Sequence, residues 1–162
     1  MAIRLRARLL RTFRGRSAAD AGWTDEEPVS AGAPESFELG RLVIDVTPRG
    51  LKAAGINHPS IVYVVSVGLP SEGRAWSSSY GFPPRQASAR RAAEAALDEL
   101  DEVARDPEAW VERVTDGMTE EEAEAMIDSP GMENDRHAAE WCAAELAPRR
   151  AQRQQAGSWL AA

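Results

Sequence analysis

The sequence predicts an α+β fold: a three-stranded antiparallel sheet followed by an Ala-rich helix and a C-terminal helical segment. Between residues 39 and 82 apolar residues follow the two-residue period of strands, and after Pro83 and Pro84 they follow the period of helices. The length fits one domain with tails. We therefore divide the chain into a basic arm and flexible linker (1–37), a single α+β domain (38–155) and a frayed tail (156–162).

The first two predicted strands differ in their patterns. The first runs from Leu39 to Thr47, where apolar residues at 42, 44 and 46 alternate with polar ones, and a turn-rich stretch fills 48–59. The second, 60–69, is almost continuously apolar (IVYVVSV), which is typical of a central strand buried on both faces. The sequence therefore places the second strand in the middle of the sheet.

The third predicted strand, 74–82, follows a turn at 70–73 and has two unlike faces. One face carries the aromatic residues Trp76, Tyr80 and Phe82. The other carries small residues, among them Ala75, Ser77 and Gly81. Which of these two faces is exposed is left open by the pattern.

Helices fill the rest of the chain. The strongest is predicted over 87–105, with Ser88 as its N-cap and an inner stripe of small residues, which we expect to pack on the small-residue face of the third strand. Shorter helices are predicted from Pro107 to about Asp116 and, through a capping box at Thr119, to about 128. A final helix is predicted over about 133–153.

The N-terminal arm is basic and contains no acid. Its arginines are Arg4, Arg6, Arg8, Arg11, Arg14 and Arg16. They interrupt every apolar run, so we expect no secretory signal. Such an arm suits phosphates of nucleic acid or lipid headgroups, but it equally suits an unstructured tail or an arm folded on acidic helices of the same chain. Translation starting downstream of the arm is a further interpretation.

The body of the chain is acidic. The whole chain carries a formal net charge of −7 and the arm carries +6, so the remainder carries −13. A body of this charge repels nucleic acid and anionic membranes. The single Cys142 cannot form an internal disulfide, and no stretch of about 18 apolar residues occurs. These features predict a cytoplasmic protein without a membrane span.

Arg85, Arg90 and Arg91 lie at the predicted start of the 87–105 helix, where cations oppose the helix dipole unless an anion is bound. Over residues 63–97, YVVSVGLPSEGRAWSSSYGFPPRQASARRAAEAAL, this arrangement resembles part of the double-stranded RNA-binding domain. The resemblance implies phosphate contacts from these arginines. The alternative is that they are ordinary solvated side chains.

The aromatic face of the third strand has two interpretations. Trp76, Tyr80 and Phe82 could stack on bases or contact a partner protein. The same residues would equally serve as core beneath the C-terminal helices, and we favour the core.

No catalytic or metal site is predicted, and no cofactor. His137, Glu140 and Cys142 do not share one helix face, and His58 is the only other histidine. Ser77, Ser78 and Ser79 lack the G-x-S-x-G context of a nucleophile, and no phosphate-binding G-x-x-x-x-G-K-S/T loop occurs. The acidic residues of 98–102 and 120–124 are placed like solvated helix faces.

The stretch VTPRGLKAAGINHPSIVYVVSVGLPSEGRAWSSSYGF with the following helix also resembles small uncharacterised proteins of actinobacterial phages, a resemblance that implies no activity. Together these observations favour a non-enzymatic interaction protein, such as a phage accessory factor, that binds a protein partner through acidic helices or the aromatic face. The alternative is RNA binding through the basic arm and the first turn of the 87–105 helix.

Overall fold

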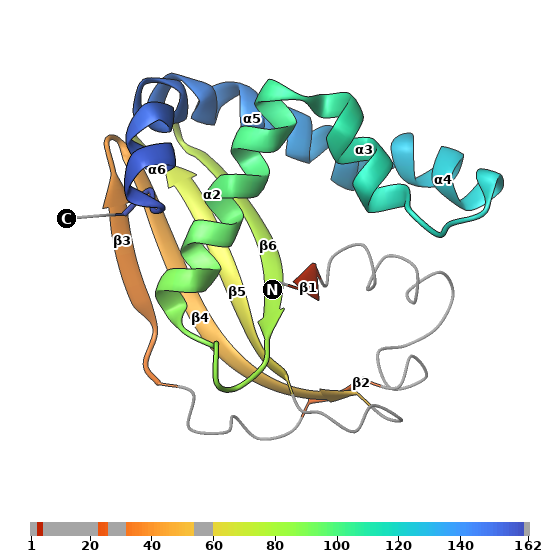
Figure 1. The fold of residues 1–162 in the computed structure, drawn as a ribbon, viewed down its shortest axis with the longest axis horizontal. Coiled ribbons are helices and arrows are strands. Elements are labelled where there is room, and N and C mark those ends of the chain that lie inside the picture. Colours follow the sequence, from red (N-terminus) through yellow and green to blue (C-terminus); the bar gives the residue numbers. More distant parts are fainter. Residues whose placement is uncertain (1–2, 5–22, 26–31, 54–59, 161–162) are drawn as a thin grey trace.

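The computed structural model describes residues 3–4, 23–25, 32–53 and 60–160. It is an α+β structure in which an antiparallel sheet is followed by helices (Figure 1). The four longer strands are β3 (Glu35–Leu39), β4 (Leu42–Ala53), β5 (Ser60–Leu69) and β6 (Arg74–Phe82). Two short strands, β1 (Ile3–Arg4) and β2 (Trp23–Asp25), add to β6 and β4.

The sheet order confirms the central position of the 60–69 strand. β5 lies between β4 and β6, with Val65 opposite Val46 on one side and opposite Ser78 on the other. A 3-10 turn at Pro70–Glu72 joins β5 to β6 and ends at Gly73. The antiparallel sheet was therefore predicted correctly, except that it contains more than three strands.

The first strand was predicted wrongly at both ends. β3 and β4 form a hairpin, with Leu39 opposite Leu42 and a two-residue turn at Gly40 and Arg41. Glycine adopts the φ of +57° at position 40 without steric cost, so the chain reverses inside the segment that was predicted as one strand. The predicted arm and linker (1–37) therefore include strands β1 and β2 and residues 35–37 of β3.

β4 also runs beyond Thr47 to Ala53, through the predicted turn. Pro48 lacks an N–H, and strands tolerate proline where no ladder bond is needed. The β3 partners of β4 end at Val46 and the β2 partners begin at Leu51, so Pro48 lies between the two pairings. On the other edge of β4, Pro48 lies opposite Tyr63, so the pairing with β5 continues past this proline.

The helices follow in the predicted order: α2 (Ala89–Arg105), α3 (Pro107–Thr115), α4 (Glu120–Ile127), α5 (Pro130–Leu146) and α6 (Arg150–Ala156), with a 3-10 turn at Ala147–Arg149. Ser88 caps α2, and Thr119 forms the predicted capping box. The final helix differs from the prediction. It begins at Pro130, where Ser129 is the N-cap, and Pro148 divides it because proline has no N–H for the helical ladder.

The main core lies between α2 and the aromatic face of β6, not the small-residue face that we had expected. Trp76, Tyr80 and Phe82 share one hydrophobic cluster with the buried alanines of α2. Each aromatic ring buries on the order of 150–250 Å², far more than Ala75 or Ser77 could. Small helix residues against large sheet residues fill this space, whereas two small faces would bury little apolar area.

A second, smaller core lies beyond the sheet. It joins the end of α2 with α3, α4 and α5 around Trp110, which has no exposed surface, and Met132. Figure 1 shows α3 and α4 on the side of the sheet opposite β3. We call residues 106–140, which comprise α3, α4 and the first part of α5, the helical lobe.

Candidate interaction surface

The three predicted anion-binding arginines differ in their contacts. Arg85, Arg90 and Arg91 are all exposed at the start of α2. The guanidinium of Arg90, however, donates a hydrogen bond from Nη2 to the carbonyl oxygen of Leu160, at 2.5 Å. Arg90 therefore holds the C-terminal segment, and Arg85 and Arg91 remain as the exposed cations of this region.

The arm arginines are described only in part. Arg4 belongs to β1, where its backbone lies opposite Tyr80. Arg6, Arg8, Arg11, Arg14 and Arg16 lie outside the described residues.

The aromatic residues of β6 are buried, each with 5% or less of its surface exposed. Trp76 donates a hydrogen bond from Nε1 to Oδ1 of the buried Asp135 in α5, at 2.7 Å. The ring of Phe82 meets that of Tyr63 edge to face, with centroids 6.1 Å apart. These side chains form the core and do not present an aromatic surface to a partner or to bases.

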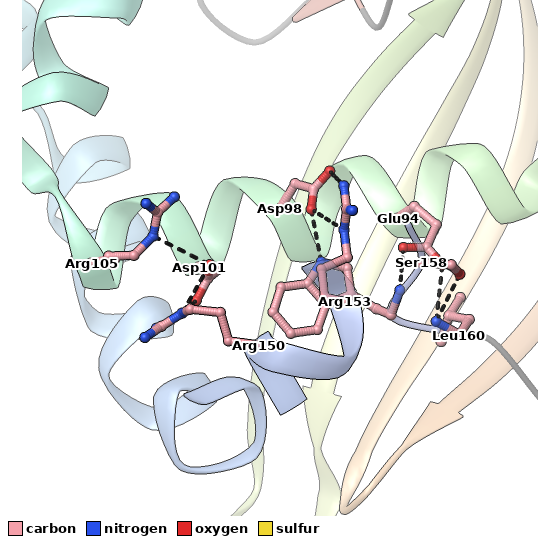
Figure 2. A network of polar contacts seen from close by, with 9 residues as sticks. Glu94, Asp98, Asp101, Arg105, Arg150, Arg153, Ser158 and Leu160 are labelled. Carbon is pink, nitrogen blue, oxygen red and sulfur yellow. Dashed lines mark hydrogen bonds and ion pairs between the residues drawn. The ribbon is translucent and has the colours of Figure 1, made fainter. Parts of the chain in front are cut away.

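The acidic residues 98–102 of α2 are not a solvated face, which corrects our expectation. Two aspartates three residues apart pair with two arginines three residues apart in α6: Arg150 Nη2 lies 2.8 Å from Asp101 Oδ1, and Arg153 Nε lies 3.0 Å from Asp98 Oδ1 (Figure 2). The hydrogen bond to Asp98 raises the pKa of Arg153. The equal three-residue spacing of the aspartates and of the arginines can be read from the sequence and could have indicated this pairing.

The predicted frayed tail is also wrong for residues 158–160. The carboxylate of Glu94 in α2 accepts hydrogen bonds from the Ser158 hydroxyl and from the backbone N–H groups of Trp159 and Leu160 (Figure 2). The Trp159 ring is 3% exposed, and its Nε1 donates to Asp98 at 2.8 Å. The segment packs on the main core through Trp159. The carboxylates of Glu94 and Asp98 therefore hold the C-terminal segment on α2.

Exposed carboxylates without an ion pair in the described part of the chain gather on the helical lobe. Its 35 residues contain twelve acids and two arginines, a formal charge of −10 within a chain of −7. Six glutamates of α3 and α4 are exposed, and none of them forms an ion pair within the described part of the chain: Glu108, Glu112, Glu120, Glu121, Glu122 and Glu124. Negative charge is thus concentrated in one lobe and not spread over the molecule.

The surface of the lobe is hollowed between α3 and α5. A depression of about 370 Å³ is lined by Pro107 and Val111, with Glu108, Glu112 and Arg136 around them. An apolar centre with a charged rim is the arrangement found in protein–protein interfaces.

The candidate metal ligands do not come together in the described residues. No three His, Cys, Asp or Glu side chains there are grouped to hold a metal ion. The His137 Nδ1 lies 3.5 Å from Glu140 Oε2 on the exposed side of α5. Burial raises the pKa of Cys142 to about 12, which disfavours its nucleophilic thiolate.

None of the helices in the described ranges combines the length and apolar character that a membrane crossing requires.

Comparison of the chain with family models, curated proteins and solved structures found no match. The function must therefore be argued from the surface itself.

Proposed function

We propose that this protein is a non-enzymatic interaction protein whose helical lobe binds a basic surface of a partner protein. The observation that carries the proposal is the apolar depression of α3 and α5 with Glu108 and Glu112 on its rim. A partner that covers Pro107 and Val111 would bury apolar area, while its lysines or arginines would meet carboxylates that have no partner within the described residues.

The charge of the lobe also supports a basic partner on kinetic grounds. Concentrated negative charge speeds the encounter with a positive surface and repels nucleic acid, and both effects weaken with salt. Other acids are already paired within the chain: Asp98 and Asp101 with α6, and Glu145 with Arg41 and Arg149. The lobe is thus where unpaired carboxylates gather.

The test compares two variants that remove the same charge. Glu108→Gln with Glu112→Gln neutralises the rim, whereas Glu38→Gln with Asp45→Asn neutralises two exposed acids on the sheet. A host protein co-purified with the wild-type chain is identified and its affinity measured for both variants. We expect only the rim variant to weaken binding, and high salt to weaken it for the wild type. Equal affinities in the two variants would remove the lobe from the interface.

RNA binding is the alternative function, and one observation favours it: α2 has no acid in its first turn and exposes Arg91 there. Arg91→Glu is the appropriate variant, because replacing Arg90 would also disturb its bond to Leu160. A steeply salt-dependent mobility shift of wild-type protein on RNA, lost in this variant, would replace our proposal. We expect no shift for either protein.

A further inference from the structure

The depression on the helical lobe has two walls of opposite charge. The wall that α3 supplies consists of two rows: Pro107 and Val111 form the apolar row, and Glu108 and Glu112 form the acidic row. Residues four apart lie one turn apart on the same side of a helix, so each row runs along the axis of α3. The residue that lines the depression from α5 is a cation, Arg136.

The opposite charges of the two walls are not paired with each other. Arg136, Glu108 and Glu112 are exposed, and none of them forms an ion pair within the described part of the chain. By contrast, the other arginine of the lobe, Arg113, donates two hydrogen bonds to Glu102. Arg136 is therefore the arginine of the lobe that remains available to a partner.

These charges determine which segment the depression favours. A segment that lies on Pro107 and Val111 removes water from both walls, and a charge that loses water without gaining a partner is destabilising. Basic side chains of the segment would meet Glu108 and Glu112. The same charge beside Arg136 would repel it, whereas a carboxylate there would accept hydrogen bonds from the guanidinium. The complementary segment therefore carries both charges.

We propose that the depression binds a partner segment of mixed charge, with a large apolar side chain on Pro107 and Val111, basic side chains toward α3, and an acidic side chain paired with Arg136. The inference rests on the proposed function for the basic side chains and adds the acid and the orientation. Turning the segment end for end would bring its bases to Arg136 and its acid to the glutamates. Arg136 thus determines which basic segments bind and how they lie.

The test is a selection of short random peptides from a display library on the full-length wild type and on three variants. Arg136→Gln removes the cation of the α5 wall, and the rim variant of Glu108 and Glu112 removes the acids of the α3 wall. Arg91→Gln, at an exposed arginine of α2 outside the lobe, is the matched control. We expect an apolar residue, bases and an acid in peptides selected on the wild type and the control. Selection on Arg136→Gln should lose the acid, and selection on the rim variant should lose the bases.

The affinity of the best wild-type peptide then tests the pair directly. Replacing its acid by the corresponding amide should weaken binding to the wild type about tenfold. The same peptide change should not affect binding to Arg136→Gln, because a double-mutant cycle isolates the contact between the two groups. Equal weakening with both proteins would show that the acid of the peptide meets another part of the chain, and the inference would be wrong.

The failures of the two proposals are distinguishable. If no peptide is enriched on the wild type, or if acids are equally frequent among peptides selected on Arg136→Gln, the segment of mixed charge is wrong. The proposed function is then still decided by the affinity of the basic partner protein for the rim variant of Glu108 and Glu112. If the acid depends on Arg136 while the partner protein binds the rim variant normally, the contribution of α3 is wrong and the contact with Arg136 stands.

Discussion

Replacement of Gly40 meets two constraints, its backbone angle and the side chains beside it. Its φ is +57°, and a Cβ built there would overlap Glu145 Oε2 and lie 2.9 Å from Arg149 Nη2. We expect Gly40→Ala to destabilise the protein by more than the roughly 1–2 kcal/mol that a left-handed alanine costs. Gly73→Ala is the control, since its φ is +63° and nothing lies within 4 Å. Urea unfolding of both variants measures the difference, and equal losses would show that Glu145 moves aside freely.

Glu145 joins the hairpin turn to α5 and makes stability depend on pH. A hydrogen bond from Arg41, with Nε 2.8 Å from Oε1, lowers the pKa of Glu145 below its usual 4.5. A lowered folded pKa means that the contribution to stability is complete above pH 4.5 and disappears as the pH falls through the folded value. We expect Glu145→Gln to reduce the acid-induced loss of stability between these values. Thermal unfolding midpoints from pH 6 to pH 3 for both proteins provide the measurement, and parallel curves would contradict the expectation.

At the scale of elements, the C-terminal segment 158–160 is attached to the main core through one large side chain, Trp159. Trp159 is buried in the main core, and its indole N–H bonds Asp98. We expect Trp159→Ala to cost about 3 kcal/mol or more, because it leaves a cavity, and Trp159→Phe to cost about 1 kcal/mol, because mainly the hydrogen bond is lost. Denaturant unfolding distinguishes the two. A wild-type midpoint for the alanine variant would mean that the segment adds nothing to the core.

The starts of helices α2, α3 and α4 could be predicted from the sequence, because capping residues mark them. Ser88, Thr119 and Asp106 each cap a helix as their sequence contexts indicate. The pairing of α6 with α2 was missed although the spacing of Asp98 and Asp101 matches that of Arg150 and Arg153, because equal spacing shows only which residues could pair. Docking of α6 also depends on the burial of Trp159 in the main core, which is a contact distant in sequence.

At the scale of the whole molecule, residues 1–37 are not separate from the domain. Glu35 and Phe37 belong to β3, and Phe37 packs on the main core. Deleting 1–37 removes this contact, so we expect the thermal midpoint to fall by at least about 4 °C. Phe37→Ala in the full chain should reproduce part of the fall. An unchanged midpoint after the deletion would show that β3 contributes nothing to stability.

The sequence by itself determined the class of the fold, the central position of β5 and the starts of α2, α3 and α4. These features depend on side-chain period, apolar continuity and caps, which act within a few residues of the chain. The acidic character of the helical lobe can likewise be read from the sequence, since all its acids lie in one continuous stretch, 106–140.

Only the tertiary structure decided which face of β6 is buried, which carboxylates remain unpaired and where a depression opens. The two faces of β6 alternate equally well in the sequence, and the choice between them follows from the apolar area that each buries against α2. Asp98 and Glu108 look alike as acidic helix residues, yet Asp98 pairs with Arg153 while Glu108 borders a depression. Pairing between distant segments depends on the packing of the whole chain, because long-range contacts form only where the core brings the elements together.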